Sequence, residues 1–504
     1  MTFESIIFRS NKAIDEIDHK NELFEDLSLK IIFKGILGNT NNQDFEEVLY
    51  KPLDSIEDIL YRQQIFNDLR SPQIFNAIKQ FSETSSTIFY NIGKLGDLYN
   101  LQRERWLLDS VYIYCNALKH LYNELNEPSI VSEGLIGIRE YIGQYMESKE
   151  FKSLEDETRE LEMDLSSIKY MMTIKGVKIT VRKDQESDNY ATEVEKIFSK
   201  FLDGDIVDSG KNLKYGFGHV EAALVELVSS LYPKQFNRLK EFYRRRLNFL
   251  EPTIARFMHE IDFYLKYLKY IEPMEENGLS FCIPQIQQDP QRMYCIDFFD
   301  VALAKKLADH KRIPVLNSIM ADQDSRIIIV TGPNNGGKTT FARAFGQAHY
   351  LALLGFPIPG KNASILKVDR IYSHFEKSEV PENAIGRLEE ELERMHYILD
   401  NATGKSLIIV NEMLSSTTLK DGIEIGKNII GKIREKGSLC LYVTFIHELA
   451  ELPGTRSYVS QVDKKNPEMR TYRILPTKSD GMAYAKALAE KYGVTYEMLR
   501  RRIS

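Results

Sequence analysis

The sequence predicts a multidomain protein of the α plus α/β class, in which a helical region with a small β-containing insertion precedes a domain with a largely parallel sheet. Three observations predict it. The chain has 504 residues, enough for about two to four domains, and 43% of them are hydrophobic. Residues 53–146 carry apolar side chains at spacings of three and four, with little Pro or Gly. After about Cys282, short apolar runs alternate with helical segments.

Composition argues against several classes of protein. The formal net charge of -7 argues against attraction for nucleic acid over the whole surface, although a local basic patch remains compatible with it. The four cysteines are scattered without a CxxC pair, which suits a reducing compartment and gives no signal for a metal site. No apolar run approaches the roughly 20 residues that cross a bilayer, and the N-terminus is too charged for a signal peptide. We expect a cytoplasmic protein with no membrane partner.

The helical region begins after about 50 residues that carry no recognisable motif. Apolar residues of "SIEDILYRQQIFNDLR" and "LLDSVYIYCNALKHLYNEL" recur at helical spacing, which is typical of core packing. The following stretch, "FKSLEDETRELEMDLSSI", is predicted to be a charged, solvent-exposed helix.

A β-hairpin is predicted next, in "KYMMTIKGVKITVRK", around a turn at Lys175-Gly176. It carries five basic residues and no acidic one: Lys169, Lys175, Lys178, Arg182 and Lys183. Such a hairpin can lie against a phosphate backbone. The alternative is a solvated hairpin whose charges only aid solubility, and the pattern does not separate the two.

Helices return between residues 218 and 275, with breaks or kinks predicted at Pro233 and Pro252. Arg244, Arg245 and Arg246 form a second basic cluster. Consecutive helical residues point to different faces, so this cluster predicts no binding site. A helix leading out, a tip with strands and a returning helix together suggest a lever that carries a pad.

Six apolar runs in the C-terminal part are predicted to be strands of an α/β domain. They are "RIIIV", "KVDRIYSHFE", "KSLIIV", "SLCLYVTF", "TRSYVS" and "RTYRIL". No repeat or low-complexity tract interrupts them.

The first of these runs leads into a phosphate-binding loop. Residues 332–339 match GxxxxGK(S/T), follow a strand and open the helix "TTFARAFGQAHYLALL". Gly336 and Gly337 allow the backbone amides to turn around phosphates, and the helix N-terminus adds partial positive charge. Lys338 is expected to reach the β- and γ-phosphates of ATP, and the Thr339 hydroxyl to bind Mg²⁺. The other positions of the loop are predicted to line the same site: Gly332, Asn334, Asn335 and Thr340.

A second nucleotide-site element follows in "SLIIVNE", a strand that ends in Asn411 and Glu412. In P-loop enzymes such a strand delivers an acidic residue to the metal, often followed by a carboxylate that polarises the attacking water. Glu412 is therefore the predicted catalytic residue. Asn411 offers a neutral oxygen, so we expect weaker metal binding. The alternative is a strand that simply ends in turn residues.

These residues carry a family resemblance. "TGPNNGGKTTFARAFG", "NATGKSLIIVNEMLSSTTLKDG" and "HELAEL" resemble the ATPase domain of the MutS family of DNA mismatch-repair proteins. The spacing from Asn411 to Asp421-Gly422 fits the family's DE…DG element. "RIPVLNSI" resembles the segment before the P-loop, in which the residue corresponding to Asn317 lies near the nucleotide. "SDGMAYAKALAEKYGV" resembles the closing segment, and "YKPLDSIEDILYRQQIFNDL" the opening of the helical core, so the likeness covers about 50–504.

The resemblance implies a domain layout and an assembly. A helical core or lever domain would span 51–165 and 216–281, with a clamp-like insertion at 166–215. An ABC-type P-loop ATPase and dimerisation domain would fill 282–504, and residues 1–50 stay unassigned. The implied assembly is a homodimer with two composite ATP sites. The basic hairpin falls inside the clamp interval, which favours contact with DNA.

The sequence also departs from the family. The chain before residue 50 is too short for the mismatch-reading and connector domains, and no small nuclease tail follows the ATPase domain. The family's reading motif has no counterpart, because Phe3 stands directly beside Glu4. We therefore expect a short member that does not recognise mismatches.

Three further departures concern hydrolysis. Asn411 replaces the strand-end Asp, and Phe445 stands where an ATP-sensing His is usual. A shifted alignment would restore His447 to that place but needs a gap. The trans-acting Ser aligns with Gly386, beside the three consecutive glutamates 389–391, an unfavourable surface for a γ-phosphate.

The expected function is that of a MutS-like ATP-binding protein that clamps duplex or branched DNA as a dimer, with ATP binding and slow hydrolysis driving the lever. The alternative is a hydrolysis-deficient, ATP-stabilised interaction module that acts on a ribosome, a branched nucleic acid or a protein partner. A third possibility is a slow hydrolase in which His447 or an arginine of the partner replaces the missing group.

Overall fold

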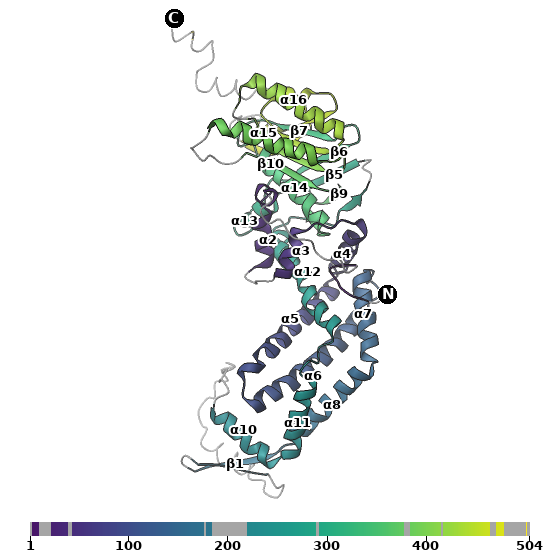
Figure 1. The fold of residues 1–504 in the computed structure, drawn as a ribbon, viewed down its shortest axis with the longest axis vertical. Helices are drawn as coiled ribbons and strands as arrows, with labels where there is room; N and C mark the ends of the chain where they lie inside the picture. The colour runs from purple at the N-terminus through teal and green to yellow at the C-terminus, as the bar shows by residue number, and fades with distance from the viewer. Residues whose placement is uncertain are drawn as a thin grey trace. The chain divides into compact units, whose positions relative to one another are not determined.

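The computed structural model describes residues 3–9, 22–38, 43–175, 178–183, 219–288, 292–376, 384–414, 417–463, 470–477 and 500. They form two compact units, which we name the helical unit and the sheet unit (Figure 1). The helical unit comprises Phe3, Pro72–Ile130 and Leu135–His259, and the sheet unit comprises Glu4–Ser71, Val131–Gly134 and Glu260–Ser504. The mixed helical and α/β composition with a parallel-rich sheet confirms the predicted class, while the predicted domain boundaries stay a prediction.

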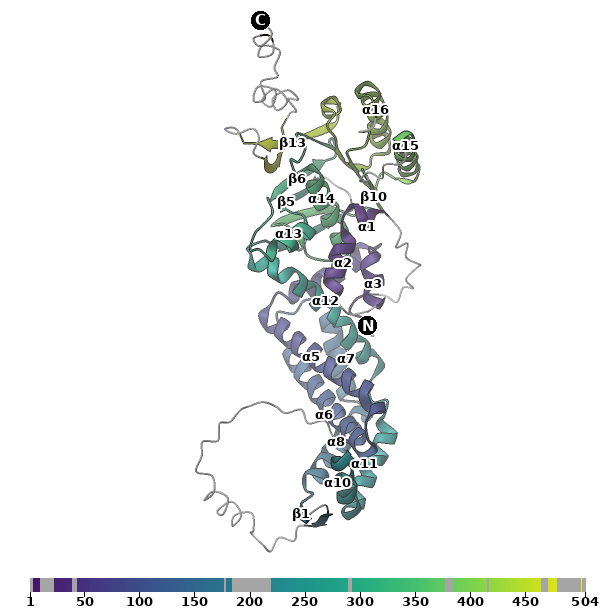
Figure 2. The same cartoon turned by 90° about the vertical axis from the view of Figure 1, so that its left-hand side faces the viewer.

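The helical unit is built from long helices and one hairpin. In chain order these are α5 (Pro72–Lys94), η1 (Leu95–Asp97), α6 (Asn100–Glu124), most of α7 (Glu133–Met146), α8 (Lys149–Ser166), β1 (Tyr170–Lys175), β2 (Lys178–Lys183), α10 (His219–Leu231), α11 (Pro233–Arg246) and the start of α12 (Pro252–Glu276). Helices α5, α6, α8 and α11 lie alongside one another (Figures 1 and 2). Helices α11 and α12 begin at Pro233 and Pro252, where breaks were predicted, because a proline at the first turn has no hydrogen bond to lose.

Helix α8 is not the solvent-exposed helix that its charge suggests. It buries an apolar stripe that contains Phe151, Leu154 and Leu161. Its carboxylates pair with cations of the two neighbouring helices. The pairs are Lys119–Glu155 and Arg105–Glu162 with α6, and Arg238–Glu160, Arg238–Asp164, Arg245–Glu157 and Arg246–Glu157 with α11. The predicted helix is confirmed, but it is exposed on one side only, and the sequence missed the pairs because the partners of these charges come from other helices.

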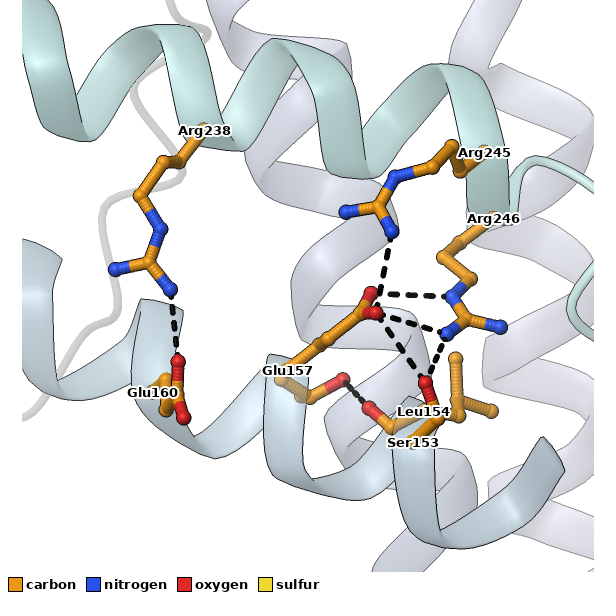
Figure 3. Close-up of polar contacts among 8 residues, drawn as sticks. Ser153, Leu154, Glu157, Glu160, Arg238, Arg245 and Arg246 are labelled. Carbon is orange, nitrogen blue, oxygen red and sulfur yellow. Dashed lines mark hydrogen bonds and ion pairs between the residues drawn. The ribbon is translucent and has the colours of Figure 1, made fainter. Parts of the chain in front are cut away.

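Glu157 is the centre of this network (Figure 3). Its carboxylate accepts hydrogen bonds from Arg246 at 3.1 and 3.2 Å and from Arg245 at 3.2 Å, and Arg246 also donates to Ser153 Oγ at 2.8 Å. Burial alone would raise the pKa of Glu157, but Arg246 and Arg245 outweigh it and hold the pKa below its ordinary value. The second basic cluster of the sequence thus serves, in part, to join α11 to α8.

The sheet unit contains a six-stranded sheet in the order β10-β11-β12-β7-β13-β14. Its strands are β7 (Ile327–Thr331), β10 (Ile371–Phe375), β11 (Leu407–Asn411), β12 (Leu439–Val443), β13 (Thr455–Val462) and β14 (Arg470–Leu475). The first five in that order run parallel, and β14 is antiparallel to β13. All six predicted strands are therefore confirmed. Figure 1 shows α15 (Ala384–Asn401) and α16 (Leu419–Lys436) on one face of this sheet and α14 (Lys338–Leu353) on the other.

A second group of strands was not predicted. A four-stranded sheet has the order β4-β9-β5-β6, and β3 pairs with β8. The elements are β3 (Phe281–Cys282), β4 (Gln285–Gln287), β5 (Arg292–Phe298), α13 (Val301–Ala308), β6 (Asn317–Asp322), β8 (Ile358–Pro359) and β9 (Asn362–Leu366). These strands are short or interrupted, so their sequences carry a weak signal.

The N-terminal residues, which carry no motif, form helices that cover α14. These helices are α1 (Leu23–Asp26), α2 (Leu29–Leu37) and α3 (Gln43–Tyr50). Helix α4 (Ile56–Asp68) follows them and confirms the helix predicted in "SIEDILYRQQIFNDLR". Phe24 and Phe33 pack against Tyr350 of α14, with ring centroids 5.8 Å apart in both pairs. Gln347 of α14 donates to the carbonyl of Leu27 at 2.9 Å. The described helices between Leu23 and Tyr50 thus contribute to the core of the sheet unit.

Arg62 of α4 lies at the C-terminal end of α14. The side chain is fully buried, and it donates to the carbonyls of Ile7 at 2.9 Å and Leu354 at 3.0 Å. Burial lowers the pKa of Arg62 to about 10, so the guanidinium is charged at pH 7. A cation at a helix C-terminus interacts favourably with the helix dipole.

Within the described residues, no helix is long and apolar enough to cross a membrane.

Replacing Glu157 with Gln should lower the free energy of unfolding of the helical unit by about 1 kcal/mol at pH 7. Because the folded pKa of Glu157 is lowered, its contribution is present above the ordinary value of 4.5 and is lost as the pH falls through the lowered pKa. The difference between the two proteins should therefore shrink on acidification. Urea denaturation followed by fluorescence of Trp106, the single tryptophan of the chain, measures this in the helical unit.

The matched control is Asp156→Asn on the same helix, because Asp156 pairs with Arg159 where both side chains are 60% exposed. That change should cost only a few tenths of a kcal/mol. Equal effects of the two substitutions at pH 7 would contradict a special role for Glu157.

Candidate nucleotide-binding site

The phosphate-binding loop connects β7 to α14 at the carboxyl edge of the six-stranded sheet. Strand β7 is fully buried and lies between β12 and β13. The loop, which follows its last residue, Thr331, therefore begins near the centre of that edge. Three residues of the loop have left-handed backbone: Gly332 (φ 127°), Asn335 (φ 58°) and Gly337 (φ 87°). Glycine adopts such angles without steric cost, which accounts for the first and last of these positions.

Ser460 of β13 holds the other side of the loop. Its hydroxyl donates to the carbonyl of Gly336 at 2.7 Å. A Cβ atom on Gly336 would lie 2.4 Å from this hydroxyl oxygen, and one on Gly332 would lie 2.8 Å from Ser460 Cβ. Close packing thus requires glycine at both positions, and at Gly332 the backbone angle φ favours glycine as well. The sequence did not identify Ser460, since no local pattern connects it with the loop.

Lys338 begins α14 and its side chain is only 2% exposed. Its ammonium group donates to the carbonyls of Gly332 and Pro333, both at 3.1 Å, and lies 3.4 Å from a carboxylate oxygen of Glu412. Burial lowers the pKa of Lys338, and Glu412 offsets part of this shift. The predicted phosphate-binding lysine and the predicted catalytic carboxylate therefore form one ion pair.

A pocket of about 920 Å³ opens in front of this pair. Nine predicted site residues line it: Asn317, Asn334, Asn335, Gly336, Gly337, Lys338, Thr339, Thr340 and Glu412. Gly332 does not line the pocket, but its carbonyl accepts a hydrogen bond from the Lys338 ammonium group. The volume suits a nucleotide.

One wall of the pocket is apolar and was not predicted. It contains Phe298, Leu303, Leu307, Ile313, Pro314 and Val315. Asn317 continues this wall, but its amide is already engaged: it donates to the carbonyl of Tyr472 at 3.1 Å and accepts from the amide of Ile474 at 2.8 Å. Tyr472, half exposed and with φ 56°, also lines the pocket. These residues come from β5, α13, the segment between α13 and β6, β6 itself and β14, so only the folded chain brings them together.

Asn411 ends β11, and Glu412 follows it directly. Glu412 has a left-handed backbone (φ 56°), and its amide donates to the carbonyl of Val443 at 3.0 Å. Asn411 is 4% exposed, and within the part of the chain that the structure describes its Oδ1 has no hydrogen-bond partner. A buried acceptor of this kind suits a hydrated cation. Thr339 lines the pocket and Asn411 is not among the described residues that do, so their joint role as Mg²⁺ ligands stays a prediction.

Two further positions that were considered for hydrolysis, Phe445 and His447, are also absent from the described residues that line the pocket. Phe445 follows β12 and is 40% exposed, while His447 begins the short helix η2 (His447–Glu451). Gly386 belongs to the first turn of α15, and its surroundings lie outside the described residues.

The predicted nucleic-acid residues belong to the hairpin β1–β2 of the helical unit. Its antiparallel register pairs Tyr170 with Lys183, Met171 with Arg182 and Lys175 with Lys178. Lys169, Arg182 and Lys183 are exposed, whereas the side chains of Lys175 and Lys178 and the turn at 176–177 lie outside the described residues, as does the predicted clamp from 184 to 215.

Tyr232, between α10 and α11, fixes the root of this hairpin. Its hydroxyl donates to the carbonyl of Lys169 at 2.5 Å, and Lys183 Nζ lies 4.8 Å from the centre of its ring. The exposed side chains therefore project from an anchored base. No local signal in the sequence connects Tyr232 with the hairpin.

Fold and loop define a P-loop nucleotide-binding domain. Residues 328–495 match the family model described as MutS domain V. The chain is also similar to proteins described as DNA mismatch repair protein MutS: that of Acetivibrio thermocellus is 28% identical over 288 residues (56% of this chain, 32% of the relative), and that of Caldicellulosiruptor bescii is 31% identical over 193 residues (37% and 22%). The corresponding protein of Ruminiclostridium cellulolyticum is 28% identical over 291 residues (56% and 32%).

These matches support a MutS-family member and confirm the resemblance found in the motifs. The matched part of the chain spans about a third or less of the length of these curated relatives.

Replacing Lys338 with Ala should weaken ATP binding on the order of 100-fold, because charge-assisted hydrogen bonds to phosphate are lost. Equilibrium titration with a fluorescent ATP analogue and Mg²⁺ measures the dissociation constant. Lys405→Ala, at an exposed lysine before β11, is the matched control and should leave affinity unchanged. Wild-type affinity in the Lys338 variant would contradict the site.

Proposed function

We propose that this is a MutS-like ATP-binding protein that clamps duplex or branched DNA as a dimer in the cytoplasm. ATP binding and slow hydrolysis drive a movement of its lever. The observation that carries the proposal is the complete phosphate cradle, with Lys338 and Glu412 paired at its mouth, in a domain that matches MutS domain V.

ATP would lie with its phosphates against the loop and its base against the apolar wall. The amides at the start of α14 and the Lys338 ammonium bind the phosphate oxygens. To do so, Lys338 must exchange the carbonyls of Gly332 and Pro333 and the carboxylate of Glu412 for phosphate. Nucleotide binding would thereby free Glu412.

Thr339 and Asn411 are the residues that would hold Mg²⁺. When bound, Mg²⁺ withdraws charge from the β- and γ-phosphates. Asn411 contributes a neutral oxygen, which binds a divalent ion less strongly than a carboxylate does. Glu412, once free of Lys338, would orient a water molecule and accept its proton. Slow turnover is the expected result.

DNA is the proposed partner of the hairpin, because the relatives are described as DNA mismatch repair proteins and Lys169, Arg182 and Lys183 are exposed together. Basic side chains at the end of an anchored hairpin can contact phosphates without reading sequence. The proposed assembly is a homodimer with two composite ATP sites.

A second candidate is a hydrolysis-deficient, ATP-stabilised interaction module that acts on a ribosome, a branched nucleic acid or a protein partner. Asn411 and Phe445 favour it, because both replace groups that the family uses with ATP. The same cradle would then serve binding alone.

Replacing Glu412 with Ala separates the two candidates. With a turning-over enzyme, the variant should lose at least about 100-fold in ATP hydrolysis while its affinity for ATP is retained or rises, because Lys338 loses a competing partner. Phosphate release is measured alone and with duplex DNA, branched DNA and ribosomes. Absence of Glu412-dependent turnover in every case would favour the second candidate.

The double variant Lys169→Ala/Arg182→Ala should bind DNA more weakly, with little dependence on sequence. Each lost phosphate contact should reduce the slope of log K against log salt by about 0.9 on duplex DNA. Fluorescence anisotropy of labelled duplex and branched DNA at several salt concentrations measures both effects. Lys152→Ala, at an exposed lysine of α8, is the control, and equal losses from it would contradict a specific role for the hairpin.

A further inference from the structure

Glu391 differs from the two glutamates that precede it in α15. Glu389 and Glu390 are exposed, whereas Glu391 is only 8% exposed. Three consecutive glutamates predict one acidic surface, and the burial of Glu391 corrects this prediction. A carboxylate is seldom buried unless it has a partner, so this one calls for a structural reason.

The Glu391 carboxylate accepts a hydrogen bond from the backbone amide of Leu414, at 3.2 Å. Leu414 is 1% exposed, so its amide is shielded from water and needs an acceptor from the protein. Glu391 provides it across 23 residues of sequence.

This contact holds a strained stretch of backbone that begins at Glu412. Glu412 (φ 56°) and Leu414 (φ 68°) are both left-handed, a conformation that non-glycine residues rarely adopt. The stretch is tied at one end through the amide of Glu412, which donates to Val443, and at the other through Leu414 and Glu391. Without the hydrogen bond between Leu414 and Glu391, the left-handed backbone keeps only the hydrogen bond from Glu412 to Val443 of the two described here.

Helix α15 is itself firmly held next to Glu391. One turn further on, Arg394 donates to the carbonyl of Ser373 at 2.7 Å and pairs with Asp26 of the N-terminal segment. His374 Nε2 donates to the carbonyl of Glu391 at 3.2 Å. Burial and the nearby Arg394 lower the pKa of His374 to about 4, so it is neutral at pH 7. These contacts fix the backbone of α15 at Glu391 and so fix the position of its side chain.

We propose that Glu391 is a positioning residue, which holds the backbone at Glu412–Leu414 so that the Glu412 carboxylate faces Lys338 and the bound phosphates. Its effect on hydrolysis rests on the proposed function, but its effect on this backbone does not. A displacement of α15 would therefore move the backbone at Leu414 and change the orientation of the Glu412 carboxylate.

The test compares Glu391→Ala, Glu391→Gln and the exposed control Glu390→Ala. Hydrogen exchange of the amides of Glu412 and Leu414 should be at least about 10-fold faster in Glu391→Ala and close to wild type in the control. The glutamine variant keeps an oxygen that can accept from Leu414, so it should retain most of the protection. ATP affinity should change less than about 3-fold, while turnover falls at least about 10-fold in Glu391→Ala and is largely restored in Glu391→Gln.

Unchanged exchange at Leu414 in Glu391→Ala would overturn the proposal. Faster exchange at Leu414 with none at Glu412 would overturn it too, because the contact would then not reach the catalytic carboxylate. If the wild-type protein shows no Glu412-dependent turnover, the hydrolytic function fails and the exchange rates alone decide the positioning role. Should Glu391→Ala fail to fold, Glu391→Gln decides: protection and turnover close to wild type support the proposal, and loss of turnover at full protection overturns it.

Discussion

The burial of α14 is the constraint on which the rest of the sheet unit depends. Almost every residue from Lys338 to Leu353 is buried, so this helix has no face that could be left to solvent. Strands β11 and β12 cover one side, the smaller sheets contribute β5, β8 and β9, and the N-terminal helices supply the remaining cover. Because the N-terminus of α14 is also the end of the phosphate-binding loop, every element that packs on the helix helps to place the cradle.

Charge at the two ends of α14 completes this arrangement. At its C-terminus, Arg62 compensates the helix dipole. At its N-terminus, the buried Lys338 ammonium is balanced by two carbonyls and by Glu412. A buried charge with a partner removed is costly, so in the proposed binding step phosphate would replace these groups as they are released. Binding of nucleotide and release of the carboxylate would in this way be a single exchange.

What the sequence could predict depends on the range of the interactions. The six strands of the main sheet were predicted because each is a contiguous apolar run, and the cradle because its spacing is set by local backbone geometry. The hairpin β1–β2 was predicted from alternation. The N-terminal helices, Ser460 and the apolar wall were missed because their partners lie far away in the chain. The exposure predicted for the carboxylates of α8 and for Glu391 was wrong for the same reason. A carboxylate is predicted to be exposed unless its partner is known, and here the partners are distant in sequence.

Binding and turnover draw on different parts of this structure. The proposed ATP binding would use the loop, the start of α14 and Lys338, which are contiguous in sequence. The proposed turnover would also depend on Asn411 as a metal ligand, on the strained backbone at Glu412, and on the supports from β12 and α15. These supports are dispersed along the chain, so under the proposed function a substitution at any of them would slow hydrolysis while the cradle stays intact. The rate of the proposed hydrolysis would then depend on residues outside the cradle, such as Glu391, as well as on Glu412.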